Sequence, residues 1–386
     1  MLLPSIALPG TAATGQDIKS AQEYLNRAET MYKAIWQYYH NDRHQLLLEN
    51  YPAGSRDSLT YMQGGAVREN EVSYLWPLSG MVSATNVFLA NKDLHARYLP
   101  YLERLHAAYD KYRDTVRKPT GYQAYPVKLE KSDRYYDDNG LVGIDYAEAY
   151  LVTRRDQYLD RSKEAFRFIL SGWDTTLGGG VPWLEGHHDQ KPACSNGMAT
   201  LTALKLFEAT KDPYYLEWGI KFYRWMHDHL RDSSGVFWND IKPGGKVNNI
   251  QWTYNSGSML EASVLLYRFT SDNWYLSEAR QIARATFARF SKMDRPQVLA
   301  FYIDLPWFVT VLFRGYESLY QTDHNPEYLL PIIYSLDYAW SHARDQYGFI
   351  TRSWTSNPQE MAKPKWLLDQ ACIAELYGRI SMLGIK

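Results

Sequence analysis

Two adjacent aspartates, Asp137 and Asp138, are the residues whose type and spacing most directly suggest chemistry in this sequence. They stand between Tyr136 and Asn139, at the end of a polar loop and directly before a long apolar segment. A turn or a helix cap is the ordinary explanation for such residues. If the apolar segment is a buried helix, however, at least one acid lies at its entrance and loses hydration, which is unfavourable for an acid without a purpose.

Two carboxyl groups that share a partly desolvated site titrate at different pH values. Burial and the repulsion between their charges raise the pKa of one of them, so that it keeps its proton near neutral pH. Cleavage of a glycosidic bond uses such a pair, because one carboxylate acts as nucleophile or base while one carboxylic acid protonates the leaving oxygen. We therefore expect Asp137 and Asp138 to be catalytic.

An internal repeat indicates which elements hold these acids. A motif of Thr or Asn, then Asp or Glu, then Tyr-Leu is clear in three copies and weaker in three more, with tyrosines at positions 24, 98, 158, 215, 275 and 328. Successive copies are 74, 60, 57, 60 and 53 residues apart. Each interval accommodates two helices and a loop, and repeats of this length indicate a fold built from helical hairpins.

Two kinds of helix alternate along these repeats. The segment from Leu216 to Arg231 is amphipathic, whereas 141–152 and 198–207 are apolar on nearly every side, which is typical of a helix buried all round. Six such hairpins predict an all-α fold, an (α/α)6 barrel with inner and outer rings; an open solenoid is the alternative. Because the copies span the chain, we expect a single catalytic domain over residues 1–386, with 1–15 as a flexible N-terminal extension.

Five long connections, at 41–72, 117–138, 172–193, 232–252 and 292–305, are rich in Gly, Pro, Asp, Trp and Tyr. Long loops in a compact domain are usually functional. Each of them joins the end of an outer helix to the start of the next inner helix, so they should gather at one mouth of the barrel. We expect the site at that mouth, where the two aspartates end the second loop.

Aromatic residues are abundant, with 32 Tyr, 13 Trp and 13 Phe making up 15% of the chain. Rings near the mouth are expected to stack on the apolar faces of sugars, with ordinary packing as the alternative. The candidates are Trp76, Trp183, Trp238, Trp252 and Tyr254. The amides of Asn196 and Asn255 stand near the starts of inner helices, where they can bind sugar hydroxyls or act as caps.

Charge and motif content exclude several other classes of function. The chain has 42 Lys and Arg residues and 43 Asp and Glu residues, which gives a net charge of −1. This balance does not indicate a basic surface that would bind nucleic acid or an anionic membrane. No apolar stretch reaches the roughly 18 to 20 residues of a membrane span, and no nucleotide-binding motif occurs. The segment His187-His188-Asp189 with Cys194 lacks a metal-ligand spacing, so we expect neither a metal nor a cofactor.

Several short motifs follow one another in an order that is specific as a set. After Tyr136-Asp137-Asp138-Asn139 come Gly179-Gly180 with Trp183, Lys191, Ser195-Asn196, Trp238 with Asp240, Thr253-Tyr254-Asn255 with Gly257, and Phe313-Arg314-Gly315. In these motifs, and through most of its length, the chain resembles glycoside hydrolase family 76, the endo-α-1,6-mannanases. Three residues depart from the family pattern: Leu141, Ser256 and Arg314 stand where Trp, Gln and Lys are usual. These departures leave open whether the chain cuts within the polymer or trims short oligomers.

The resemblance implies a retaining (α/α)6-barrel hydrolase that acts on α-1,6-mannan or mannooligosaccharides. It makes Asp137 the nucleophile and Asp138 the general acid/base, with a covalent mannosyl-enzyme intermediate. It also adds Tyr136, Asn139, Asp240 and Arg314 to the substrate-binding candidates. The resemblance implies a secreted or periplasmic enzyme, although 1–15 lacks the pattern of a signal peptide, and a monomer is the default expectation.

Two other functions remain open at the level of the sequence. The same barrel serves sugar epimerases and isomerases, which generally use paired histidines at the mouth and act on free sugars. A non-catalytic glycan-binding protein would keep the aromatic cleft without turnover. Adjacent aspartates favour the hydrolase over both.

Overall fold

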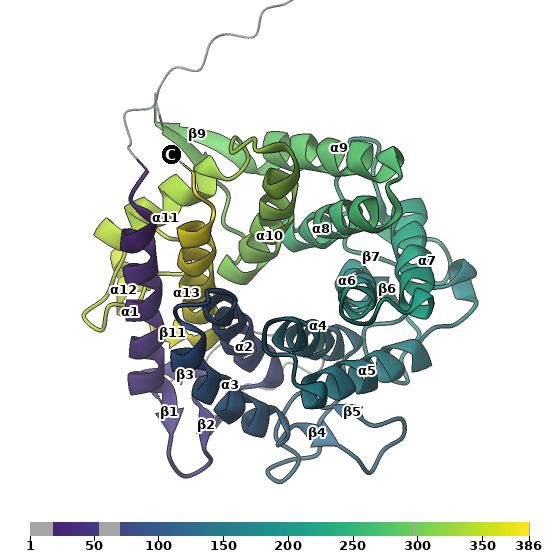
Figure 1. Cartoon of the computed structure of the whole chain (residues 1–386), viewed down its shortest axis with the longest axis horizontal. Helices are drawn as coiled ribbons and strands as arrows, with labels where there is room; N and C mark the ends of the chain where they lie inside the picture. Colours follow the sequence, from purple (N-terminus) through teal and green to yellow (C-terminus); the bar gives the residue numbers. More distant parts are fainter. Residues whose placement is uncertain (1–17, 54–69, 296–297, 386) are drawn as a thin grey trace, which may run out of the picture.

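The computed structural model describes residues 18–53, 70–295 and 298–385, and these form two concentric rings of helices around one axis (Figure 1). The extension expected over residues 1–15 lies outside the described residues. The described part holds thirteen α-helices and short antiparallel strands. It is mostly helical, as the sequence predicts.

The inner ring consists of six helices that are buried on nearly all sides. They are α2 (Leu75–Ala90), α4 (Tyr136–Thr153), α6 (Ala193–Thr210), α8 (Thr253–Thr270), α10 (Pro306–Asp323) and α13 (Leu367–Met382). Each packs on the next, and α13 packs on α2, so the ring is closed. Closure confirms the (α/α)6 barrel and excludes the open solenoid.

The outer ring consists of helices with one solvated side. They are α1 (Ala21–Tyr39), α3 (His95–Tyr109), α5 (Asp156–Ser171), α7 (Pro213–Leu230), α9 (Asn273–Phe290) and α11 (Leu330–His342). Helix α1 packs on α13, so the sixth pair joins the first and last helices of the described chain. The barrel is therefore closed by contacts between the two ends of the sequence.

The buried face of α7 differs in part from the face that its helical periodicity predicts, which carries Leu216, Ile220, Tyr223, His227 and Leu230. Tyr223 and Leu230 are fully buried, but Leu216 and Ile220 are only half-buried, and Phe222 and Met226 are fully buried as well. The helix contacts both α6 and α8. The amphipathic character is confirmed, but the apolar face extends to Phe222 and Met226.

The repeated motif forms the short turns from inner to outer helices. After Thr210, Lys211 adopts a left-handed conformation with φ of 60°, and the carboxylate of Asp212 accepts a hydrogen bond from the amide of Tyr214 and caps α7. The turn at Thr270-Ser271-Asp272 repeats both features. A left-handed residue ends one helix and a capping aspartate begins the next, so the motif marks the turns at the end of the barrel opposite the predicted mouth.

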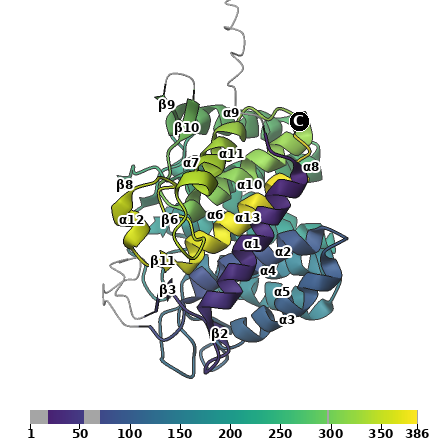
Figure 2. The same ribbon diagram turned by 90° about the vertical axis from the view of Figure 1, so that its left-hand side faces the viewer.

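The connections from outer to inner helices lie at the other end of the barrel and are braced by short strands, several of which appear on the left of Figure 2. The pairs are β1 (His40–Asn41) with β2 (Leu46–Leu47), β3 (Asn50–Tyr51) with β11 (Lys365–Trp366), β4 (Arg113–Asp114) with β5 (Gly121–Tyr122), and β9 (Ser291–Arg295) with β10 (Val298–Phe301). A three-stranded sheet joins β6 (Lys191–Pro192), β7 (Asp240–Ile241) and β8 (Val247–Asn248). A short helix, α12 (Pro358–Ala362), lies in the last connection. Helical periodicity does not predict these strands, which tie the loops to one another.

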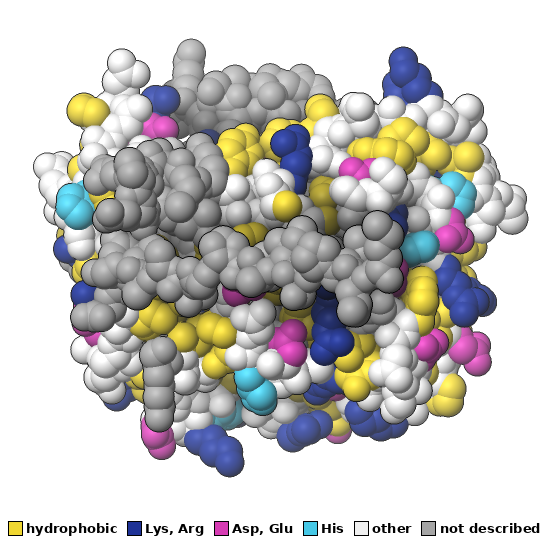
Figure 3. Space-filling view, turned by 90° about the horizontal axis from the view of Figure 1, so that it is seen from above, with side chains coloured by type: hydrophobic (Ala, Val, Ile, Leu, Met, Phe, Trp, Pro, Cys, Tyr) yellow, Lys and Arg dark blue, Asp and Glu magenta, His cyan; other side chains and the backbone are white. Residues whose placement is uncertain are grey.

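Surface charge follows the balanced composition. On the face shown in Figure 3, acidic and basic side chains are interspersed. Within the described ranges, no helix combines the length and apolarity that a membrane span requires.

Candidate active site

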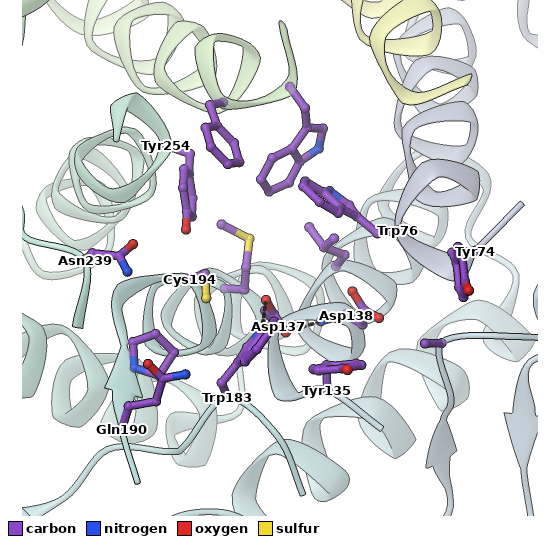
Figure 4. Close-up of a pocket in the computed structure, with 16 residues that line it drawn as sticks. Tyr74, Trp76, Tyr135, Asp137, Asp138, Trp183, Gln190, Cys194, Asn239 and Tyr254 are labelled. Atoms are coloured by element: carbon purple, nitrogen blue, oxygen red, sulfur yellow. Dashed lines mark hydrogen bonds between the residues drawn. The ribbon is translucent and has the colours of Figure 1, made fainter. Parts of the chain in front are cut away.

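A cavity of about 250 Å³ opens where the N-termini of the inner helices meet the loops (Figure 4). Its wall is largely aromatic, with Asp137 and Asp138 on one side. The rings are Tyr74, Trp76, Tyr135, Trp183, Tyr254, Trp307 and Phe308. The two candidate acids therefore face a shared cavity, as the sequence predicts.

The geometry of the inner helices explains how the cavity is assembled. The second residue of α2, α4, α6, α8 and α10 lines it, and these residues are Trp76, Asp137, Cys194, Tyr254 and Trp307. Equivalent positions in packed helices of the same orientation point toward the same axis. The site is thus a ring of helix entrances.

Asp137 is held by hydrogen bonds on both carboxylate oxygens. The indole Nε1 of Trp183 donates to Oδ2 at 3.0 Å, and the backbone amide of Asp138 donates to Oδ1 at 3.1 Å. The thiol of Cys194 lines the same cavity and interacts with this carboxylate. A carboxylate that accepts several hydrogen bonds keeps its negative charge more readily than one without them.

The two acids differ in how strongly they hold a proton. Burial raises the pKa of Asp137 to about 6, while its hydrogen bonds to Cys194 and Trp183 oppose the rise. Burial and the charge of Asp137 raise the pKa of Asp138 further, well above its ordinary value. The geometry therefore favours an ionised Asp137 beside a protonated Asp138 near neutral pH, which is the division that acid-assisted cleavage of a glycoside needs.

Aromatic rings form walls on both sides of the acids. The ring of Tyr135 lies 4.9 Å from that of Trp183 at a tilt of 46°, next to Asp137. Across the cavity, Phe308 lies 4.1 Å from Tyr254 and is stacked with Trp76 at 6.3 Å between centroids. Such rings suit the flat, apolar faces of pyranoses.

The family of the chain follows from its match to a known family model. The family model described as "Glycosyl hydrolase family 76" matches residues 23–299, which is well over half of the chain. The chain belongs to glycoside hydrolase family 76. The resemblance seen in its sequence motifs is thereby confirmed.

Relatives of known name and structure agree with family 76. The mannan endo-1,6-alpha-mannosidase DCW1 of Candida glabrata is 34% identical over 187 residues, an alignment that covers 43% of this chain and 42% of that protein. A family 76 mannosidase structure from Bacteroides thetaiotaomicron is 27% identical, has a TM-score of 0.82, and is matched over 93% of this chain and 98% of that one. The chain thus aligns with less than half of the curated relative but with nearly all of the solved structure.

A further structure shares the fold. It is an inactive variant of the α-1,6-mannanase of Salegentibacter sp., with two adjacent aspartates replaced by alanine, in complex with α-1,6-mannotetrose. It is 21% identical, with a TM-score of 0.74 over 93% of this chain and 99% of that one.

In the family 76 site of this chain, the predicted asparagines do not line the cavity. Asn196 is fully buried, and its amide bonds the backbone N–H and C=O of Val181 at 2.8 and 2.9 Å. Asn139 clamps Tyr122 in the same way, at 2.7 and 2.9 Å. Asn255 donates to the carbonyl of Trp238 at 3.4 Å. All three side chains bind the preceding loop to the start of an inner helix. This structural role is close to the helix cap that the sequence offered as the alternative to sugar binding.

Four other predicted binding residues also lie outside the cavity wall. Tyr136 is buried and stacks on a phenylalanine of α5 at 5.0 Å. Trp252 is half-buried and packs on the outside of Phe308 at 5.9 Å, and Trp238 is half-buried in the loop before α8. Arg314 is buried deep in the barrel, where its Nε donates to Glu375 at 2.7 Å. Patterns of type and spacing do not separate these packing roles from sugar contacts.

Asp240 does not line the cavity itself but contacts a residue that does. Its Oδ2 accepts hydrogen bonds from Asn239 at 2.9 Å and from Asn248 at 2.7 Å, and Asn239 lines the cavity. Asp240 therefore fixes a lining amide instead of facing the cavity itself.

Several lining residues were missed from the sequence. They are Tyr74, Tyr135, Gln190, Cys194, Asn239, Trp307 and Phe308. Alignment of the inner helices by their second residue would have found Cys194 and Trp307, since it places them level with Asp137. The loop residues carry no comparable signal, because their position depends on tertiary contacts.

No cluster of three or more His, Cys, Asp or Glu side chains suited to a metal ion occurs within the described ranges. In the segment His187-His188-Asp189, the His188 side chain is exposed and lies 3.2 Å from Asp174. The cavity lining contains Cys194 but no histidine among the described residues.

Proposed function

We propose that this chain hydrolyses α-1,6-mannosidic linkages in mannan or mannooligosaccharides by a retaining double displacement. Membership of family 76 and the names of its relatives support the substrate class. One structural observation supports the mechanism. Two adjacent acids face one aromatic cavity, and the side chain of Asp137 accepts hydrogen bonds from Trp183 and from the backbone amide of Asp138.

In the first step, a carboxylate oxygen of Asp137 attacks the anomeric carbon as its bond to the leaving oxygen breaks. Asp138 transfers its proton to that oxygen, so the leaving sugar departs as an alcohol and a mannosyl ester forms on Asp137. The raised pKa of Asp138 suits this acid role, because burial and the neighbouring charge keep it protonated.

In the second step, Asp138 is ionised and takes a proton from water. The water oxygen attacks the anomeric carbon, the ester bond to Asp137 breaks, and both acids return to their starting states. Two inversions give net retention at the anomeric carbon. Trp183 and the backbone amide of Asp138 each donate to one oxygen of Asp137, which supports a fixed orientation of this carboxylate during both steps.

For substrate binding we propose the predicted residues that line the cavity, Trp76, Trp183 and Tyr254, together with the missed rings Trp307 and Phe308. Stacking of sugars on these rings would place the scissile bond beside the acids. Of the three departures from the family pattern, only Leu141 lines the cavity. Any effect on preference between polymer and short oligomers should therefore be sought at Leu141.

Product analysis tests the proposed function directly. The wild-type protein should release mannooligosaccharides from unbranched α-1,6-mannan, whereas Asp137→Asn and Asp138→Asn should each lose at least about a thousandfold in kcat while remaining folded. Binding of α-1,6-mannotetraose without cleavage by the wild type would contradict the hydrolase and support a glycan-binding protein.

Azide distinguishes the roles of the two acids. With an activated α-mannoside, azide should restore turnover of Asp137→Ala and yield the β-mannosyl azide, since it replaces the missing nucleophile. Near-normal turnover of Asp137→Ala without azide would overturn the assignment. The epimerase alternative lacks support, because family 76 is a hydrolase family and no histidine is found among the described cavity residues.

We further propose that the enzyme works outside the cytoplasm, in the periplasm or after secretion, because a polymeric mannan does not cross a cell membrane. Fractionation followed by immunodetection checks this location. Recovery of the protein exclusively in the cytoplasm would contradict it.

A further inference from the structure

Cys194 occupies the same place on α6 that Asp137 occupies on α4. Each is the second residue of its helix, the two helices are packed against each other, and both side chains line the cavity. Figure 4 shows Cys194 between Tyr254 and Asp137. This position results from the pseudo-symmetry of the barrel.

The side chains on either side of Cys194 interact with its thiol. The Asp137 carboxylate on α4 and the hydroxyl of Tyr254 on α8 both line the cavity beside Cys194, and each is electrostatically coupled to it. In a hydrogen bond between the thiol and Asp137 the thiol is the donor, because an ionised carboxylate only accepts hydrogen bonds. The second residues of three consecutive inner helices thus form one row of contacts, called the relay below.

We propose that Cys194 is a positioning residue for the reaction of Asp137: its thiol donates a hydrogen bond that, opposite Trp183, fixes the orientation and charge of that carboxylate. The proposal rests on the proposed function, in which Asp137 is the nucleophile. It assigns to the thiol no covalent role.

The surroundings of the thiol favour this role over that of a reactive cysteine. Burial and the charge of Asp137 raise the pKa of Cys194 well above its ordinary value, so the sulfur stays a protonated donor. The other titratable groups facing it are Asp138 on α4 and the phenols of Tyr254, Tyr74 and Tyr135. Beyond Tyr254, Asp304 accepts a hydrogen bond from the backbone of α8.

Cations would change this conclusion, because a nearby positive charge lowers the pKa of a thiol. No Lys, Arg or His side chain occurs among the described residues that line the cavity. The Asp137 carboxylate therefore depends on neutral donors to keep its charge: Trp183, the backbone amide of Asp138 and the proposed thiol donor.

The pH dependence of hydrolysis tests the donor. In Cys194→Ala the acidic limb of the kcat/KM profile should move up by about one pH unit, the low end of the effect of a hydrogen bond to a charged group. Cys194→Ser should keep the limb near its wild-type position, because the hydroxyl also donates. The two variants have nearly equal side-chain volumes, so a difference between them reports the donor and not the space.

Equal profiles for the Ala and Ser variants, whether shifted or not, would overturn the proposal and leave Cys194 as a packing residue. Tyr254→Phe provides a second comparison, since it keeps the ring and removes the start of the relay. It should shift the limb in the same direction as Cys194→Ala but by less.

A second measurement does not depend on hydrolysis. Alkylation of Cys194 by iodoacetamide at pH 9, followed by mass spectrometry, should be several times faster in Asp137→Asn than in the wild type, because loss of the charge lowers the pKa of the thiol. Asp138→Asn is the matched control and should change the rate much less, since the charge that raises the pKa of Cys194 is that of Asp137. The second cysteine, Cys372, is fully buried and should not react in the folded protein.

These outcomes separate the two proposals. If the wild type does not cleave α-1,6-mannan, the proposed function fails, and the alkylation rates still test the contact between the thiol and Asp137. If the wild type cleaves mannan but Asp137→Asn and Asp138→Asn react with iodoacetamide at equal rates, the role of Cys194 is refuted while the hydrolase stands.

Discussion

At the scale of single residues, the two acids are chemically identical but lie in different surroundings. Asp137 accepts hydrogen bonds from Trp183 and the backbone and lies beside the Cys194 thiol, whereas the charge of Asp137 itself acts on Asp138. This asymmetry sets which acid is ionised. The roles proposed for the nucleophile and the acid therefore rest on the surroundings of each carboxyl group, including Trp183 from a neighbouring loop.

The pH profile of hydrolysis should be bell-shaped. Activity requires Asp137 ionised, so kcat/KM should fall as pH drops below about 6, the pKa to which burial raises this acid. It also requires Asp138 protonated, so kcat/KM should fall again on the alkaline side, where that acid loses its proton. Steady-state kinetics on α-1,6-mannotetraose between pH 4 and 10 checks both limbs. A flat profile down to pH 4 would contradict the ionised role of Asp137.

The same acids should destabilise the fold at neutral pH. A carboxyl group whose pKa is raised by folding contributes stability below about pH 3.9, where the unfolded chain still holds the proton, and loses that contribution as pH rises through the folded pKa. Asp138→Asn removes this loss. Its free energy of unfolding should exceed that of the wild type by at least about 1 kcal/mol at pH 7 and match it near pH 3.5. Urea denaturation at the two pH values measures the difference, and a variant less stable at pH 7 would refute it.

At the scale of the elements, several inner helices bind the preceding loop through the side chain of their fourth residue. The fourth residue of α4, α6 and α13 is Asn139, Asn196 or Gln370, and each amide bonds both the N–H and the C=O of one residue in the preceding loop. In α8 the hydroxyl of Ser256 takes this place, accepting from the amide of Phe237 at 3.0 Å. Loops that carry site residues are thereby fixed to the rigid ring.

Replacement of two equivalent clamps should separate stability from activity. Asn196→Ala leaves buried backbone groups of Val181 unpaired and should lower the free energy of unfolding by about 2 to 4 kcal/mol. It should also lower kcat at least tenfold, because the same loop carries Trp183. Gln370→Ala, which frees Ile350 in a loop that does not line the cavity, should destabilise comparably with little change in kcat.

The comparison uses thermal or urea unfolding together with kinetics at a temperature where both variants remain folded. Equal losses of kcat in the two variants would mean that the clamps act through global stability. A loss confined to Asn196→Ala would support a local role in placing Trp183.

At the scale of the whole molecule, charged residues below the cavity link the inner helices. Arg314 on α10 pairs with Glu375 on α13 at 2.7 and 2.8 Å, and Arg379 joins Glu375 to Glu317. Lys205 on α6 connects Glu148 and Glu261 of its two neighbours at 3.1 and 3.0 Å. These pairs tie α10 to α13, and α6 to α4 and α8, in the interior of the ring.

Arg314→Met should reveal a structural role for this residue, which was predicted to bind sugar. Loss of the guanidinium leaves the fully buried Glu375 with Arg379 as its remaining cation, so unfolding should become about 3 kcal/mol easier. Arg314 does not line the cavity, so KM for mannotetraose should stay within about twofold of the wild type. A large rise in KM with unchanged stability would restore the sugar-binding hypothesis.

We propose that residues 18–385 form a single domain, because α1 and α13, from the two ends of the described chain, pack together and close the ring. Calorimetry should then show one cooperative transition. Two resolved transitions would contradict a single domain.

The sequence by itself determined the fold class and the candidate catalytic pair. Burial periodicity is a local property, and a six-fold repeat of buried and amphipathic helices leaves few closed arrangements. The Asp137-Asp138 pair stood out because acids at the entrance of an apolar helix are unfavourable without a function. Local pattern also located the loops that form the mouth.

Only the tertiary structure decided which side chains meet at the cavity. Asn196 and Arg314 have the residue types of sugar ligands, but the packing of neighbouring helices assigns them to a loop clamp and an ion pair. Cys194 and Trp307 carry no signal of their own, yet the ring brings them to Asp137 and to the opposite wall. Whether a polar group near a helix entrance faces ligand or backbone depends on elements far away in the chain, and local spacing does not encode that contact.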